Sequence, residues 1–147
     1  MAGPFKFNLQ KVLEYREQLE EQAKMALAQA IAAVRDQELR IESLARRVRE
    51  NEREASSKKS LTPAEMWLYR TYKERLLQDI ATARKDLEVL KKRLEKRRAE
   101  AVEKSKDRKL LEKLKSNQAV NYARAESLKE QNGFDEMATI RYQPKVI

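Results

Sequence analysis

Apolar residues recur at alternating steps of three and four along two long stretches of the chain. The first stretch runs from Leu9 to about Ala55 and contains neither glycine nor proline. One set of apolar positions is Leu27, Ala30, Val34, Ile41, Leu44 and Val48, with Gln37 as a polar break. Earlier in the stretch, a similar stripe on a slightly rotated face consists of Leu9, Val12, Leu19, Ala23, Ala26 and Ala30. Such steps give a repeat near 3.5 residues, which a helix can bury only by winding around a partner helix. The pattern predicts a first helix over residues 9–56.

The same repeat resumes after an interruption at residues 56–62. Its second stretch comprises Tyr69, Leu76, Ile80, Ala83, Leu87, Leu90 and Leu94. The start is typical of a helix N-terminus, because Thr62 can cap a backbone N–H and Pro63 suits the first helical position. Glu65, three residues after the cap, can reach back to it. The second helix is therefore predicted to begin at residue 63.

Gly133 marks the predicted end of the second helix. It follows Gln131-Asn132 and suits the position just past a helix C-terminus, so the helix is predicted over residues 63–132. We expect a tail over residues 133–147, in which Phe134–Tyr142 forms one more short helical turn and 143–147 frays.

A connection of about seven residues favours an antiparallel pair of helices. The sequence therefore predicts an all-α fold, a single elongated domain over residues 1–147 built as a long two-helix antiparallel coiled-coil hairpin. Folding about the turn places the start of the first helix opposite roughly residues 110–115. Residues beyond about Leu114 then lack a partner unless the N-terminal residues extend to meet them.

Composition argues against catalysis. Charged residues make up 39% of the chain, and cysteine and histidine are both absent. Their absence excludes disulfides, thiolate nucleophiles, Cys/His zinc sites and imidazole acid–base chemistry. No glycine-rich phosphate loop or EF-hand spacing occurs. We expect no enzymatic activity, no cofactor, no metal and no small-molecule substrate. Without a signal-peptide-like start or a run of about 18 apolar residues, a soluble cytoplasmic protein is expected.

Positive charge is concentrated in residues 91–115, which carry +7 of the net +9. Nucleic-acid binding is one interpretation, because rows of lysine and arginine release counterions from phosphates. A basic zipper would, however, place the cationic helix before the apolar repeat, and here it follows the repeat. Interleaved acids also favour a solvated helix face with i,i+4 ion pairs. A protein partner with an acidic lining is favoured, with nucleic-acid binding or a purely structural coiled coil as alternatives.

Large aromatic side chains gather at the start of the second helix. Tyr69, Tyr72 and Leu76 follow steps of three and four and share one face of the helix. Tyr69 and Leu76 are expected to fill the apolar stripe. Because Trp67 and Tyr72 cannot both join them there, at least one large ring should be exposed. Exposed aromatics are typical anchors for protein partners.

Three segments resemble one known family. FKFNLQKVLEYREQLEEQAKMALAQA is similar to an opening F-x-L-x-x-V-L-x-x-R followed by acids and an alanine-rich helix. WLYRTYKERLLQDI resembles the aromatic start of that family's second helix. RKLLEKLKSNQAVNYARAESLKEQNGFDEMA resembles its Lys/Leu/Glu run with Tyr122, Glu126, Glu130, Gln131 and the Asp135-Glu136 pair. The turn SSKKSLTP matches no family pattern. In order and spacing the segments resemble FliJ, the coiled-coil protein of the flagellar type III export apparatus.

The resemblance implies a two-helix coiled coil similar to the stalk of rotary ATPases. Members of the family act in a hexameric export ATPase ring, promote its assembly and activity, link it to the membrane export gate and are associated with export chaperones. The implied location is cytoplasmic, peripheral to the inner membrane at the flagellar base. The equivalent stalk of a virulence secretion system is an alternative.

The resemblance also implies two sets of contact residues. The gate-binding face would comprise Tyr69, Tyr72 and Leu76. The ATPase-ring end would comprise residues 9–23 of the first helix with the basic stretch 91–115 opposite or beyond them. Its contact residues would be Lys91, Lys92, Arg93, Arg97, Arg98, Arg108 and Lys109.

Overall fold

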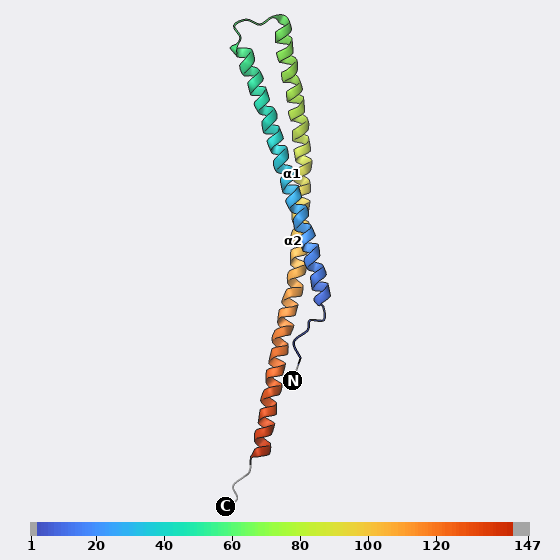
Figure 1. Cartoon of the computed structure of the whole chain (residues 1–147). Helices are drawn as coiled ribbons and strands as arrows, with labels where there is room; N and C mark the ends of the chain where they lie inside the picture. The colour runs from blue at the N-terminus through green and yellow to red at the C-terminus, as the bar shows by residue number, and fades with distance from the viewer. Residues whose placement is uncertain (1–2, 143–147) are drawn as a thin grey trace, which may run out of the picture. The chain divides into compact units, whose positions relative to one another are not determined.

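The computed structural model describes residues 3–142 of the chain. Helix α1 spans Gln10–Ser57, with 48 residues, and α2 spans Pro63–Arg141, with 79 residues. They pack against each other as an all-α helical hairpin, joined by the short connection 58–62 (Figure 1). The predicted fold class is confirmed.

The start of α2 follows the capping prediction. The Glu65 backbone N–H donates to Thr62 Oγ1 at 3.2 Å, and the Met66 N–H donates to the Thr62 carbonyl at 3.0 Å. The Glu65 carboxylate takes a different partner, the Lys58 ammonium group across the connection, at 3.3 Å. The turn is therefore closed by a side-chain cap and by one ion pair.

The predicted end of α2 at residue 132 is wrong, as is a tail that begins at 133. The helix passes through Gly133, whose φ is not positive, and continues to Arg141. A glycine ends a helix only when it adopts the left-handed conformation, and inside a helix it costs about 1 kcal/mol relative to alanine. The good helix formers Glu136, Met137 and Ala138 then carry the helix on. The predicted frayed residues 143–147 lie outside the described part of the chain.

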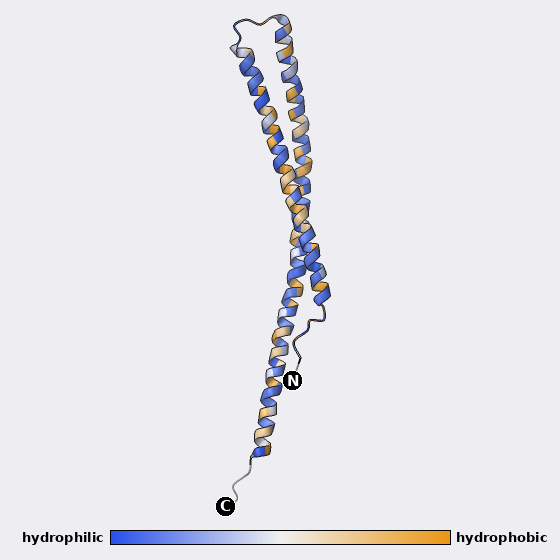
Figure 2. Ribbon diagram, in the orientation of Figure 1, coloured by the Kyte–Doolittle hydropathy of each residue, from blue (hydrophilic) through white to orange (hydrophobic). Residues whose placement is uncertain are grey.

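The chain divides into two compact units. The turn unit is Glu21–Val102, and the terminal unit combines Met1–Glu20 with Glu103–Ile147. Apolar residues lie among polar ones along both helices (Figure 2), as expected for a narrow buried stripe.

The turn unit has an apolar core formed by both helices. Its buried members are Leu44, Leu76, Ile80 and Ala83, and Ile41 and Val48 pack against them. Two amides also face the partner helix. Gln37 Nε2 donates to the Ala83 carbonyl at 2.9 Å, and Asn51 Nδ2 donates to the Tyr69 carbonyl at 3.1 Å. The predicted stripe, including its polar break at Gln37, is confirmed in this unit.

The terminal unit joins the helices through ion pairs, and it also buries two apolar side chains, Phe7 at 7% and Leu13 at 3% exposed. Arg16 Nη1 lies 3.2 Å from Asp107 Oδ2, and Arg108 Nε lies 2.6 Å from Glu20 Oε2. Before α1, the Phe5 ring packs 5.6 Å from the Tyr122 ring, centroid to centroid, and the Tyr122 hydroxyl donates to the Gly3 carbonyl. The N-terminal segment thus contacts α2 at Tyr122, which is one of the two possibilities that the sequence left open for residues beyond about Leu114.

Candidate partner-binding surfaces

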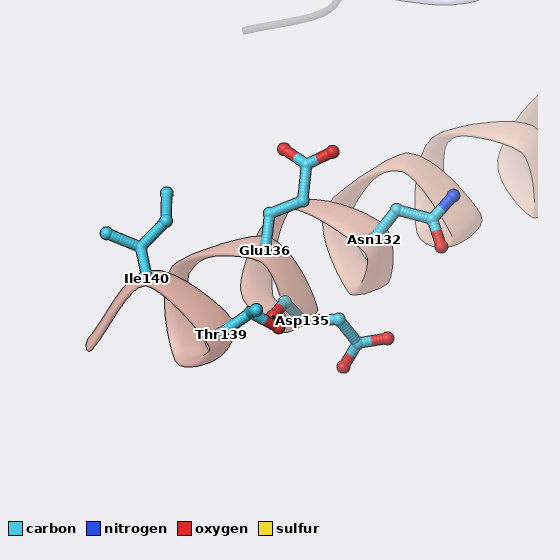
Figure 3. Close-up of a pocket in the computed structure, with 5 residues that line it drawn as sticks. All are labelled: Asn132, Asp135, Glu136, Thr139 and Ile140. Atoms are coloured by element: carbon cyan, nitrogen blue, oxygen red, sulfur yellow. Dashed lines mark hydrogen bonds between the residues drawn. The ribbon is translucent and has the colours of Figure 1, made fainter. Parts of the chain in front are cut away.

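The described residues contain no group of three or more acidic, histidine or cysteine side chains that could hold a metal. Within the same range, neither helix is long and apolar enough to cross a membrane. One hollow near the C-terminal end of α2 is lined by Asn132, Asp135, Glu136, Thr139 and Ile140 (Figure 3). All five come from one helix, and the Thr139 hydroxyl donates to the Asp135 carbonyl at 2.9 Å. This hollow is an open side of the helix and encloses no site.

At the turn end of α2, large apolar side chains lie in solvent. Trp67 is 63% exposed, Leu68 60% and Tyr72 46%, so the predicted exposed aromatic is confirmed twice. Leu68 and Tyr72 are one helical turn apart and share a side of α2. Leu68 is not among the contact residues predicted from the sequence, although its spacing of four residues from Tyr72 could have shown that the two share a side of the helix.

The residues predicted to bind the export gate lie at different depths. Tyr72 is exposed, Tyr69 is half-buried and Leu76 is only 3% exposed within the apolar core. A groove of about 390 Å³ runs beside them, lined by Asn51, Glu54, Lys58, Glu65, Leu68, Tyr69 and Tyr72. A partner in this groove can touch both tyrosines, whereas Leu76 supports the surface from inside.

Lys58 holds a positive charge at this groove. Its ammonium nitrogen lies 5.3 Å from the centroid of the Tyr69 ring and 3.3 Å from Glu65. Tyr69 raises the pKa of Lys58 most, and Glu65 raises it further. The ammonium form is thereby favoured, so one side of the aromatic groove carries a fixed cation.

Most of the predicted ATPase-binding cations are already engaged in ion pairs. Lys91 lies 3.8 Å from Glu88, Arg97 lies 3.0 Å from Glu100, and Arg98 lies 3.0 Å from Glu95. These pairs join residues three apart, whereas the sequence predicted a spacing of four, which occurs in the pair Arg108–Glu112.

Arg108 joins α1 to α2. It pairs with Glu20 of α1 and with Glu112 of α2, each at 2.6 Å, and its side chain is 20% exposed. Glu20 is the main cause that raises the pKa of Arg108. Arg108 therefore holds the helices together instead of offering a free charge.

Lys92, Arg93 and Lys109 are exposed, and among the described residues none of them forms an ion pair. Arg93 and Arg97 also line a groove of about 430 Å³ beside the alanine-rich part of α1, formed by Ala26, Gln29, Ala30 and Ala33. Of the seven residues predicted to bind the ATPase, these three are thus the ones whose charge is not already engaged in an ion pair within the described chain.

Comparison with known proteins gives one positive finding. The family model described as "Flagellar FliJ protein" matches residues 5–146, nearly the whole chain. A search of curated proteins and a search of solved structures each found no match. The family match agrees with the resemblance of the three sequence segments and with the helical hairpin. This chain belongs to the FliJ family.

Proposed function

We propose that this chain, a component of the flagellar type III export apparatus by its family, acts as the stalk of a hexameric export ATPase. In this proposal it also links the ATPase to the membrane export gate, at the cytoplasmic face of the inner membrane, and associates with export chaperones. The observation that carries the proposal is that α2 offers two different contact surfaces. One is aromatic, with Leu68 and Tyr72, and the other is cationic, with Lys92 and Arg93 in the turn unit. Lys109 adds a separate cation in the terminal unit, and none of the three forms an ion pair among the described residues.

The ATPase part of the proposal rests on these unpaired cations and on symmetry. A single hairpin in a six-fold ring cannot contact all subunits equally, so it favours some active sites over others. Such a bias is a coupling free energy between the stalk and the active sites. Unpaired cations suit this role, because complementary charge speeds encounter and fixes register.

The ATPase part is tested with the purified chain and its cognate export ATPase. We expect the chain to raise ATP turnover and hexamer formation, and a Lys92→Gln, Arg93→Gln, Lys109→Gln variant to do so less. A matched control removes the charges of three exposed lysines outside this set, Lys59, Lys85 and Lys96. The idea fails if the unmodified chain changes neither quantity at low salt and in excess.

The gate part rests on the exposed pair Leu68 and Tyr72. We propose Tyr72 as the direct contact, Tyr69 as the edge of the groove and Leu76 as the core residue beneath them. A Leu68→Ala, Tyr72→Ala double variant should weaken binding to the isolated gate domain, as measured by calorimetry, and keep the helical circular dichroism. Trp67→Ala is the control for loss of an exposed ring on another side of α2. Normal gate binding by the double variant would exclude this face.

Two other functions compete with this one. Nucleic-acid binding is disfavoured because ion pairs neutralise Lys91, Arg97, Arg98 and Arg108, although the net charge of +9 still supports a test. Tight binding to arbitrary duplex with a steep salt dependence would favour it over the stalk. A virulence-system stalk is disfavoured by the flagellar description of the matching family. Stimulation of a virulence ATPase but not a flagellar one would reverse that choice.

A further inference from the structure

We infer that one outward side of α2, formed by Lys106, Lys109, Leu110 and Lys113, binds an acidic amphipathic helix of a partner protein. We call this side the lysine face. It belongs to the terminal unit and has no part in the aromatic groove. Only Lys109 is shared with the proposed ATPase contacts, so the inference goes beyond the proposed function.

The lysine face is a shaped surface. Its residues stand at i, i+3, i+4 and i+7, a spacing that places side chains on one side of a helix. They line a shallow groove of about 330 Å³. Leu110 is 68% exposed, and the aliphatic stems of the three lysines border it. The face thus offers an apolar centre surrounded by ammonium groups.

The acids near the lysine face are mostly occupied elsewhere. Asp107 pairs with Arg16, and Glu112 pairs with Arg108. Among the described residues, Lys106, Lys109 and Lys113 form no ion pair. Like charges three and four residues apart repel each other and weaken a helix. A partner that brings carboxylates would remove this repulsion.

Leu110 decides which anionic partner fits. A membrane surface would need a broad apolar face to insert, and the groove holds a single leucine. A nucleic-acid backbone would pair with the lysines but would leave Leu110 without a complement. A helix with one apolar residue between carboxylates matches both parts of the face, since such anchors bind in apolar sites with a charged rim.

The test uses the full chain and a fluorescent synthetic helix that carries a leucine with glutamates three and four residues to either side. A matched peptide has glutamine at each glutamate. By fluorescence anisotropy, we expect the acidic peptide to bind and the glutamine peptide to bind at least about tenfold more weakly. Lys106→Gln with Lys109→Gln and Lys113→Gln should weaken acidic-peptide binding about tenfold, and Leu110→Gln alone should weaken it comparably.

The control variant removes three other exposed lysines, Lys59, Lys85 and Lys96, and should bind the acidic peptide nearly as the unmodified chain does. Circular dichroism checks that every variant stays helical. Equal losses in the control and the lysine-face variant would reduce the effect to net charge and overturn the inference. An unchanged affinity of Leu110→Gln would overturn it as well, as would tighter binding to anionic lipid vesicles or to duplex DNA. Because the assay contains no ATPase, its failure leaves the stalk proposal intact.

Discussion

The turn unit and the terminal unit share the same two helices but hold them together by different means. In the turn unit, Leu76, Ile80 and Ala83 of α2 form one buried cluster with Leu44 of α1. In the terminal unit, the contacts between helices include the ion pairs Arg16–Asp107 and Arg108–Glu20. The turn unit thus has a clustered apolar core, which we call the apolar seam. In the terminal unit ion pairs lie beside two buried apolar side chains, Phe7 and Leu13, and we call this the charged seam.

The two kinds of seam differ in strength and in sensitivity to solvent. Burying apolar area stabilises a fold by about 25 cal/mol per Å², and this term does not depend on charge. Exposed ion pairs contribute about 0–1 kcal/mol, and salt screens them. Arg16 and Asp107 are 39% and 37% exposed at their side chains, so their pair belongs to the weak class. Glu20 and Arg108 are 8% and 20% exposed at their side chains, so salt screens their pair less. The apolar seam should therefore carry more of the stability, and the charged seam should remain easier to open.

The largest expected effect is the loss of the apolar seam. Leu76→Ala removes a side chain that is 3% exposed, and such truncations cost about 2–5 kcal/mol. We expect a clear drop in the midpoint of thermal unfolding, followed by circular dichroism. Leu77→Ala, at a neighbouring position that is 47% exposed, should change stability by about 0.5 kcal/mol or less. Similar losses in both variants would contradict the assignment of the core.

The apolar seam is also the part that the sequence predicted best. Its repeat and the Thr62 cap are local signals, and a cap or a stripe of period 3.5 depends on residues only a few positions apart. The same stripe also predicts that at least one of Trp67 and Tyr72 is exposed, because two large rings on different sides of the helix cannot both be buried, and the structure exposes both.

The charged seam could not be predicted in the same way. Glu20 and Arg108 are 88 residues apart, and many acids and bases are equally available to either of them in sequence. Which cations of the basic segment stay unpaired also depends on rotamers and on the facing helix. The sequence therefore groups Arg108 with Lys109 as a partner contact, although Arg108 is engaged between the helices and Lys109 forms no ion pair among the described residues. The helix end predicted at Gly133 is wrong for a related reason. Only the φ angle of this glycine distinguishes a helix end from a helix interior, and the sequence does not give that angle.

Asn51 is a buried polar residue in the turn unit, and its substitution should give an intermediate effect. It is 8% exposed and donates to the Tyr69 carbonyl at 3.1 Å. Asn51→Ala should cost about 0.5–1.5 kcal/mol, the usual net value of one hydrogen bond, in denaturant unfolding. Asn117→Ala, at an exposed position of α2, controls for the higher helix propensity of alanine. An equal effect of both substitutions would mean that the bond adds nothing to the seam.

Glu20→Gln tests the charged seam directly. The change removes the carboxylate charge that faces Arg108 but keeps the shape of the side chain, while Arg108 retains Glu112. We expect faster hydrogen exchange in residues 10–20 and 103–122, with little change around Leu44 and Ile80. Glu21→Gln, an exposed neighbour, is the control. Raising the salt concentration should reduce the difference in hydrogen exchange between the variant and the unmodified chain. Exchange that changes equally in both units would contradict the difference between the apolar and the charged seam.

The smallest expected effect concerns Lys58, a charged contact at the turn end of the apolar unit. Its pKa is raised above the usual 10.5, first by Tyr69 and then by Glu65. A raised pKa means that folding favours the ammonium form, so this contribution is complete below about pH 10.5 and is lost as the pH rises through the higher folded value. Tyr69→Phe should bring the pKa of Lys58 back toward its usual value more than Glu65→Gln does, in an NMR titration of the Lys58 side chain. If neither substitution lowers the pKa of Lys58, then neither contact favours its ammonium form, and the turn is closed by the Thr62 cap without a contribution from this charge.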